Sequence, residues 1–232
     1  PQRKGGDKVN VEYLPLRLRQ DRLEVLDQRL LPFEEKFLQV ESINDCCDVI
    51  SQMVVRGAPL IGFTAIWGMG IWCQKEAQSL VEVEDVAEKL KNCRPTAVNL
   101  MYEVDRTVRL IKAERKSGNS FMEAGQKVFE FAEFEMRQLY LRNKKMAEDV
   151  HHFLNQHTGK RSFNVLTLCN TGALACGPMG TALGVISHLH GQGALGEAWL
   201  CETRPYLQGS RLSSFELMKE GVPHQILVEG AS

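Results

Sequence analysis

The chain has 232 residues, enough for one large domain or two modest ones. Its 28 Lys and Arg residues nearly balance 29 Asp and Glu residues, and the net charge of −1 argues against nucleic acid as the main partner. The longest apolar stretch, residues 59–73, is too short to span a bilayer and contains Gly and Pro, so we expect no membrane insertion.

The seven cysteines are odd in number, and no two have the Cys-X-X-Cys spacing. Free thiols of this kind are typical of a protein from the reducing cytoplasm. The histidines at 188, 190 and 224 also lack metal-ligand spacing, so we expect no metal site. The cysteines lie at positions 46, 47, 73, 93, 169, 176 and 201.

The first part of the chain has the pattern of a small antiparallel sheet followed by helices. Residues 1–8 are typical of a mobile terminus. Leucines at every second position from 14 to 18 and a turn signal at 20–21 predict a β-hairpin over roughly 11–28, and 37–40 suits another short strand. Caps and breaks then predict helices over 42–56, 59–72, 81–92, 97–116 and 121–156.

Two of these helices indicate where the core lies. The helix over 59–72 is apolar on all sides, which predicts a central position. Its glycines at 62, 68 and 70 disfavour a helix unless another backbone packs closely against them. In the last helix an aromatic cluster at helical spacing is more often core than ligand site. The predicted core residues there are Phe129, Phe131, Phe134 and Met136.

A change of pattern at residues 158–161 predicts a domain boundary, with a mainly helical N-terminal domain over 1–158 and a second domain over 159–232. In the second domain, residues 163–184 predict a buried strand, a tight turn and one helix packed closely on the sheet. Strands at 198–201 and 225–228, with a helix over 209–220 between them, complete an α/β pattern with a parallel sheet.

Three parallel strands with a bare edge make a poor free-standing sheet, because unpaired strand edges invite aggregation. We therefore expect the chain to be part of a longer protein, or one piece of a cleaved protein, rather than a natural short form.

The turn after the first parallel strand is the first candidate site. Cys169 stands where the strand ends and the helix begins, the position at which open α/β sheets bind ligands. A thiol there would face the positive end of a helix, which favours the thiolate. From the position alone, a buried structural cysteine is the more common explanation, because free cysteine is among the most buried residue types.

Two arginines have a second pattern in common. Arg56 and Arg94 each precede the start of a predicted helix, where a guanidinium and free helix N–H groups together suit a phosphate. Gly57 would let the backbone approach a ligand closely. Surface ion pairing is the alternative role for either arginine.

Four motifs in order resemble the methylthioribose-1-phosphate isomerase family, from about residue 11 to the end of the chain. This family belongs to a superfamily with the alpha, beta and delta subunits of eukaryotic initiation factor two-B. The motifs are VRGAPLIG at 55–62, RPTAVN at 94–99, CNTGALA at 169–175 and ETRPYLQGSRL at 202–212.

The resemblance implies a mainly helical N-terminal domain and the first half of a Rossmann-like domain, usually in a homodimer. It implies an aldose–ketose isomerase of methionine salvage that converts 5-methylthioribose 1-phosphate to 5-methylthioribulose 1-phosphate without a cofactor. Cys169 would be the active-site cysteine. The residues that would bind the substrate and its phosphate are Arg56, Gly57, Ala58, Arg94 and Gln208.

The sequence departs from the family at its catalytic aspartate. The family's Gly-Ala-Asp-Arg motif is not in this sequence, and neither is the Asn-Lys pair that follows it. Alternatives within the superfamily are a ribose-1,5-bisphosphate isomerase and a non-enzymatic regulatory subunit of the initiation factor. The regulatory subunits generally lack the cysteine loop, so Cys169 favours an isomerase. A scaffold without a ligand would leave Arg56, Arg94 and Gln208 far apart.

Overall fold

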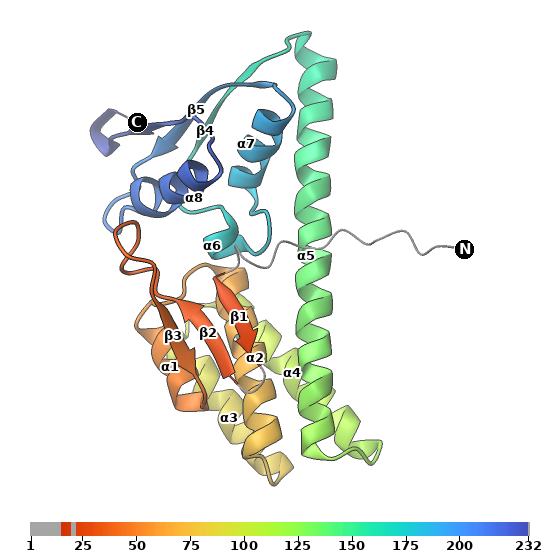
Figure 1. Cartoon of the computed structure of the whole chain (residues 1–232). Helices are drawn as coiled ribbons and strands as arrows, with labels where there is room; N and C mark the ends of the chain where they lie inside the picture. The colour runs from red at the N-terminus through yellow and green to blue at the C-terminus, as the bar shows by residue number, and fades with distance from the viewer. Residues whose placement is uncertain (1–14, 20–21, 232) are drawn as a thin grey trace.

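The computed structural model describes residues 15–19 and 22–231. The N-terminal strands form an antiparallel sheet in the order β1-β2-β3 (Figure 1). This confirms the predicted hairpin and the short strand after it, while the predicted mobile terminus at 1–8 and turn at 20–21 lie outside the described residues. The strands are β1 Leu16–Arg19, β2 Arg22–Leu26 and β3 Phe37–Val40.

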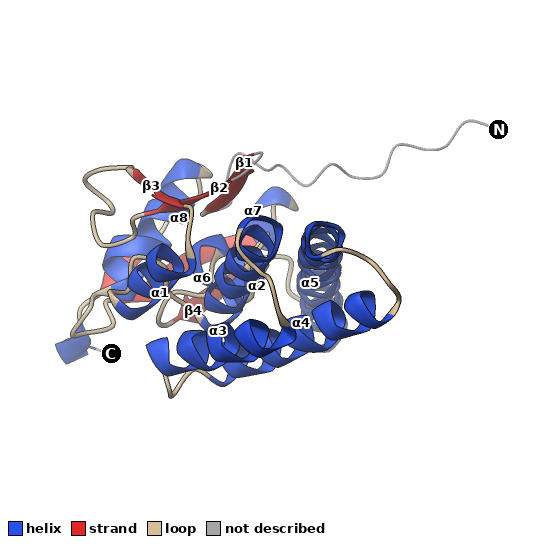
Figure 2. Ribbon diagram, turned by 90° about the horizontal axis from the view of Figure 1, so that it is seen from below, coloured by secondary structure: helices blue, strands red, loops and turns tan. Residues whose placement is uncertain are grey.

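Five helices follow, as the sequence predicts, but the first ends at Ser51 rather than at residue 56. The first begins at a capping box in which the Ser42 side chain accepts from the Asp45 amide and the Asp45 carboxylate accepts from the Ser42 amide. Seen from below, α2 lies between α1 and α5 (Figure 2), and it also packs against α4. The helices are α1 Ile43–Ser51, α2 Ala58–Lys75, α3 Leu80–Cys93, α4 Val98–Lys116 and α5 Phe121–Thr158.

The central position of α2 is confirmed, because every residue from 60 to 73 is buried. Its glycines face close neighbours. A Cβ at Gly68 would lie 2.6 Å from Cys46 Sγ, and one at Gly70 would lie 2.5 Å from the Phe129 ring. A Cβ at either glycine would meet these side chains, so the small residues make room for packed sulfur and aromatic groups. The predicted close approach of another backbone occurs at Gly70, since a Cβ on Gly125 of α5 would lie 2.8 Å from the Gly70 carbonyl oxygen.

Along α5 the predicted aromatic core holds only in part. Phe129 and Met136 are buried and Phe131 is half-buried, but Phe134 is 57% exposed, so its assignment to the core was wrong. The buried positions 129, 132 and 136 follow the helical period, and residue 134 falls on the opposite face.

The 38 residues of α5 give it a length of about 57 Å, so it runs along both halves of the molecule (Figure 1). Its first half packs against α2, and its last turns share a small core with Phe163, Val185 and Leu189. The helix ends at Gly159, which caps it in the left-handed conformation. The division into domains at this point stays a prediction.

The second half contains a parallel sheet in the order β4-β5-β6, which confirms the predicted α/β pattern. The strands are β4 Phe163–Thr167, β5 Leu195–Cys201 and β6 Gln225–Leu227. The helical segments are α6 Ala173–Cys176, α7 Ala182–Gly191, the π-helix η2 Gly209–Ser213, α8 Ser214–Lys219 and the 3₁₀ turn η3 Glu229–Ala231.

Two expectations for residues 163–184 were wrong. The single helix is two, α6 and α7, because Gly177 and Gly180 take positive φ angles of 75° and 74° on either side of Pro178 and Met179. The first strand is not buried on both faces, since α7 and α8 cover only one side of the sheet. On the other side, Leu166 is 61% exposed. No helix among the described residues is both long enough and apolar enough to cross a membrane.

Contacts of the β2–β3 loop tie the two halves together. The buried Gln28 side chain donates through Nε2 to the Leu174 carbonyl oxygen at 2.7 Å. Beside it, an apolar cluster joins Leu26 and Leu31 of the first half to Leu174 and Leu212 of the second.

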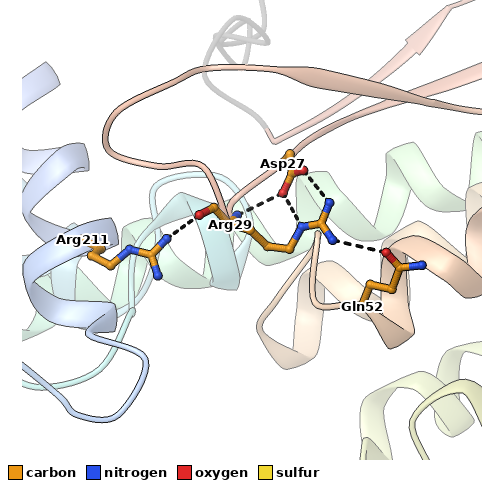
Figure 3. A network of polar contacts seen from close by, with 4 residues as sticks. All are labelled: Asp27, Arg29, Gln52 and Arg211. Atoms are coloured by element: carbon orange, nitrogen blue, oxygen red, sulfur yellow. Dashed lines mark hydrogen bonds and ion pairs between the residues drawn. The ribbon is translucent and has the colours of Figure 1, made fainter.

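Arg211 of η2 makes the second tie. It donates to the carbonyl oxygen of Leu31 through Nε at 3.1 Å and through Nη2 at 2.9 Å, and Nη2 also donates to the Arg29 carbonyl at 2.6 Å. The Arg29 side chain binds Asp27 and Gln52 (Figure 3). That pairing lowers the pKa of the buried Asp27 carboxyl below its ordinary value.

Arg211→Lys should therefore weaken the contact between the halves. A lysine has no planar fork and cannot reproduce the donors to both carbonyl oxygens. We expect a loss of about 1–3 kcal/mol in the free energy of unfolding, measured by urea denaturation. The exposed Arg137→Lys on α5 is the matched control. Equal midpoints for the two variants would contradict the role given to Arg211.

Candidate active site

The candidate site lies where the start of α2 meets the loops that follow β4 and β5. These two strands are parallel neighbours, so their carboxyl ends open on the same edge of the sheet. The loop after β4 contains Cys169, and the loop after β5 leads to Gln208. All of the predicted site residues come from these two loops, the start of α2 and the end of α3.

Gly57 allows α2 to approach the second half. It is the N-cap of the helix, with a φ of 87° that side chains rarely adopt. A Cβ on it would lie 2.4 Å from the Ala175 Cβ and 2.6 Å from the Ala175 carbonyl oxygen. Only a glycine fits here, and its neighbours Arg56 and Ala58 are thereby held next to α6.

Cys169 is half-buried and strongly constrained. Its φ is 67°, a conformation that is uncommon for a residue with a side chain. Its N–H donates to Thr203 Oγ1 at 2.9 Å, and its carbonyl oxygen accepts from Ser213 Oγ at 2.9 Å. Such backbone outliers, where the surrounding structure enforces them, cluster at functional sites.

Arg56 connects the helical half to the loop after β5. With the Gln208 amide oriented to satisfy both of its ends, its oxygen accepts from Arg56 Nη2 at 3.0 Å and its nitrogen donates to the Thr203 carbonyl at 2.8 Å. The guanidinium also stacks 5.2 Å from the centre of the Tyr206 ring. Thr203 therefore links Gln208 to Cys169.

Three titratable groups, Cys169, Arg211 and Arg94, affect the pKa of Arg56. Burial lowers the pKa of its guanidinium, the positive charges of Arg211 and Arg94 act in the same direction, and Cys169 opposes them. Within the described part of the chain, neither Arg56 nor Arg94 forms an ion pair with a carboxylate. Surface ion pairing, the alternative role for these arginines, is therefore not what the structure shows.

A scaffold without a ligand would leave the predicted site residues far apart, and the positions of these residues argue against that alternative. Arg56, Gln208 and Cys169 are brought together, and Arg94 lies close enough to act on the charge of Arg56. Arg94 itself lies at the C-terminal end of α3, four residues before α4 begins. The result is a positively charged surface around a thiol, which suits an anionic ligand.

Glu216 is a residue of this site that the sequence analysis missed. It is 2% exposed and lies on α8, directly behind the cysteine loop. Its Oε2 accepts from the Ala173 N–H at 2.6 Å and from the Leu174 N–H at 3.3 Å. Burial raises the pKa of its carboxyl to about 8, although these two hydrogen bonds act in the opposite direction.

The position of the Glu216 carboxyl group contradicts the expected environment of the Cys169 thiol. The thiol was predicted to face the free N–H groups of the following helix. That helix, α6, has only four residues, and its first two N–H groups are occupied by Glu216. The signal in the sequence was a lone acidic residue between Leu212 and Leu217, two apolar core positions.

The chain is similar to proteins named as isomerases and to proteins named as initiation-factor subunits. The model described as the initiation factor 2 subunit family matches residues 54–231. Methylthioribose-1-phosphate isomerase of Aquifex aeolicus is 39% identical over 229 residues, covering 98% of this chain and 45% of that protein. The isomerase of the same name from Leptospira biflexa is 36% identical over 233 residues, covering 95% and 61%.

Solved structures agree with this. 5-Methylthioribose 1-phosphate isomerase from Pyrococcus horikoshii OT3 superposes with a TM-score of 0.78 at 30% identity, covering 94% of this chain and 61% of that one. Translation initiation factor eIF-2B subunit delta from A. fulgidus superposes with a TM-score of 0.80 at 29% identity, covering 94% and 62%. The chain thus spans between about half and three-fifths of these relatives.

Gly57→Ala should disrupt the site because it combines an unfavourable φ with a backbone clash. Gly118→Ala is the matched control, since Gly118 has a φ of 93° but a Cβ added to it would meet no atom within 4 Å. We expect the control to cost about 1 kcal/mol and Gly57→Ala at least about 2 kcal/mol more, by chemical denaturation. Similar costs for the two variants would show that the contact with Ala175 is not tight.

Proposed function

Because the chain belongs to the initiation factor 2 subunit family, we propose that it forms part of an aldose–ketose isomerase acting on 5-methylthioribose 1-phosphate. The bacterial relatives described above have this activity in their names. The observation that supports the proposal most directly is the assembly of Cys169, Arg56 and Gln208 at one place, from motifs far apart in the sequence.

The chemistry of the substrate explains the need for such a site. A phosphate on C1 locks the sugar as a ring, so no free aldehyde is available. The ring must first open with the help of an acid, and a hydrogen then moves from C2 to C1, as a proton through an enolate or as a hydride. By either route, a thiol and a carboxyl group held on opposite sides of the sugar could divide the work.

The arginines suit the phosphate of this substrate. Arg56 and Arg94 are cationic and lack carboxylate partners among the described residues. The start of α2 has no side-chain cap, so the backbone at Gly57 and Ala58 is free to face an anion at the positive end of an 18-residue helix. Gln208 would fix the Arg56 guanidinium and contact the sugar.

Cys169 would act on the reacting carbons. The half-buried thiol is held by its own backbone contacts, and a carboxyl group on the opposite side of the sugar would complete the pair. The resemblance assigns that carboxyl to an aspartate motif that this sequence does not contain. We therefore propose that the remaining part of the protein, on the same chain or on a second one, supplies it.

The parallel sheet supports the same proposal independently. Its outer face presents Leu166, 61% exposed, and Leu168, 63% exposed, next to the half-buried Trp199 and Leu227. Parallel sheets are normally covered on both faces. A further layer of a Rossmann-like domain would cover these side chains.

We propose that the complete subunits form a homodimer in the cytoplasm. All seven cysteines are free, as in a reducing compartment.

Cys169→Ala, in the intact protein that contains this chain, should lower kcat by a factor of roughly 10² to 10⁴ while the substrate Kd stays within about twofold. Turnover is measured as ketose formation, and Kd by calorimetry. Cys201→Ala is the matched control, because Cys201 is also half-buried and ends the neighbouring strand. Parallel losses of binding and turnover would indicate a structural thiol.

Arg94→Ala should instead weaken substrate binding. Loss of a charge-assisted hydrogen bond to phosphate predicts an increase of roughly tenfold or more in Kd. The exposed Arg109→Ala on α4 controls for the change in net charge. An unchanged Kd for Arg94→Ala would remove this residue from the phosphate site.

A further inference from the structure

The cysteine loop is held from behind by a single helical segment. Ser213, the last residue of η2, donates to the Cys169 carbonyl oxygen at 2.9 Å. Glu216, on the first turn of α8, accepts from the N–H groups of Ala173 and Leu174. The two ends of the loop are therefore anchored three residues apart on the same segment.

The fit between Glu216 and the loop is tight. A Cβ at Gly172 would lie 2.4 Å from both carboxylate oxygens of Glu216, so the backbone of the loop rests directly on the carboxyl group. From the other side, Gly180 approaches the Gly172 Cα so closely that a Cβ there would lie 2.6 Å from it. The turn between Cys169 and α6 has almost no room to move while both contacts are made.

Packing alone does not require an acid at this position. Burial of Glu216 disfavours its ionised form, and Glu220 on the same helix acts in that direction too. An apolar side chain would avoid this cost but would leave the N–H groups of Ala173 and Leu174 without an acceptor. The role of the acid is therefore to accept hydrogen bonds from the backbone N–H groups of the turn.

We propose that Glu216 is a positioning residue, which holds the turn after Gly172 and thereby keeps Cys169 in its left-handed conformation, with the thiol directed by the loop. Its hydrogen bonds go to the backbone of Ala173 and Leu174, so its effect on the thiol is exerted through the chain of the loop. The consequence for turnover rests on the proposed isomerase function, whereas the consequence for the loop does not.

Glu216→Gln tests the role in the loop. The amide has nearly the same shape, but it replaces one of the two carboxyl oxygens that face the N–H groups of residues 173 and 174 with an NH2 group that cannot accept. These N–H groups should therefore exchange with deuterium roughly tenfold faster. The alkylation rate of Cys169 by iodoacetamide, relative to that of Cys201, should change by about threefold or more. Mass spectrometry of peptides reports both quantities.

Two comparisons separate positioning from general destabilisation. Glu220→Gln changes an exposed acid that directly follows the last residue of α8 and should leave exchange at residues 169–176 unchanged. Peptides from the β1–β3 sheet should exchange at the wild-type rate in Glu216→Gln. Exchange that is unchanged at 169–176, or raised equally in both sheets, would overturn the proposal.

If Glu216→Gln does not fold, Glu216→Asp takes its place. It keeps the carboxyl group but is shorter by one methylene, so we expect the same local increase in exchange. Absence of that increase in the folded variant would overturn the proposal. Turnover is measured in parallel on the intact protein. A wild-type protein without isomerase activity but with this local response would refute the proposed function alone, and an active protein without the response would refute the role of Glu216 alone.

Discussion

The site depends on one close contact between backbones. Gly57, at the start of α2, lies so near Ala175 that no side chain could stand between them. The contact determines how closely the helical half can approach the sheet. Since α2 is buried from residue 60 to residue 73, it cannot shift independently of its neighbours. Arg56 faces Gln208 for this reason. The hydrogen bond from Gln28 to Leu174 reinforces the same junction from the neighbouring residue of α6.

Much of the fold could be predicted from the sequence because strong local patterns coincide with the tertiary structure. The apolar stretch of α2, the capping signals at Ser42 and Ser120 and the alternating leucines of β1 all correspond to observed elements. Phe134 shows the limit. Aromatic residues crowd that part of α5, and only the packing partners decide which face of a helix is buried.

Some residues of the candidate site could likewise be predicted from the sequence, and one could not. Arg56, Arg94 and Gln208 could be found because each is followed directly by a glycine or a proline. Cys169 could be found because it lies in the turn after a strand, and the family resemblance connected the four loops. Glu216 could not be found by that route, because it lies within a helix. Its importance comes from the N–H groups of residues 173 and 174, which a sequence places more than forty positions away.

The charges around Arg56 favour an anion at the site. The guanidinium groups of Arg94 and Arg211 both disfavour the charged form of Arg56, so the three cations repel one another. Arg211 is also one of the ties between the two halves, through Leu31. An anion bound at Arg56 would offset this repulsion.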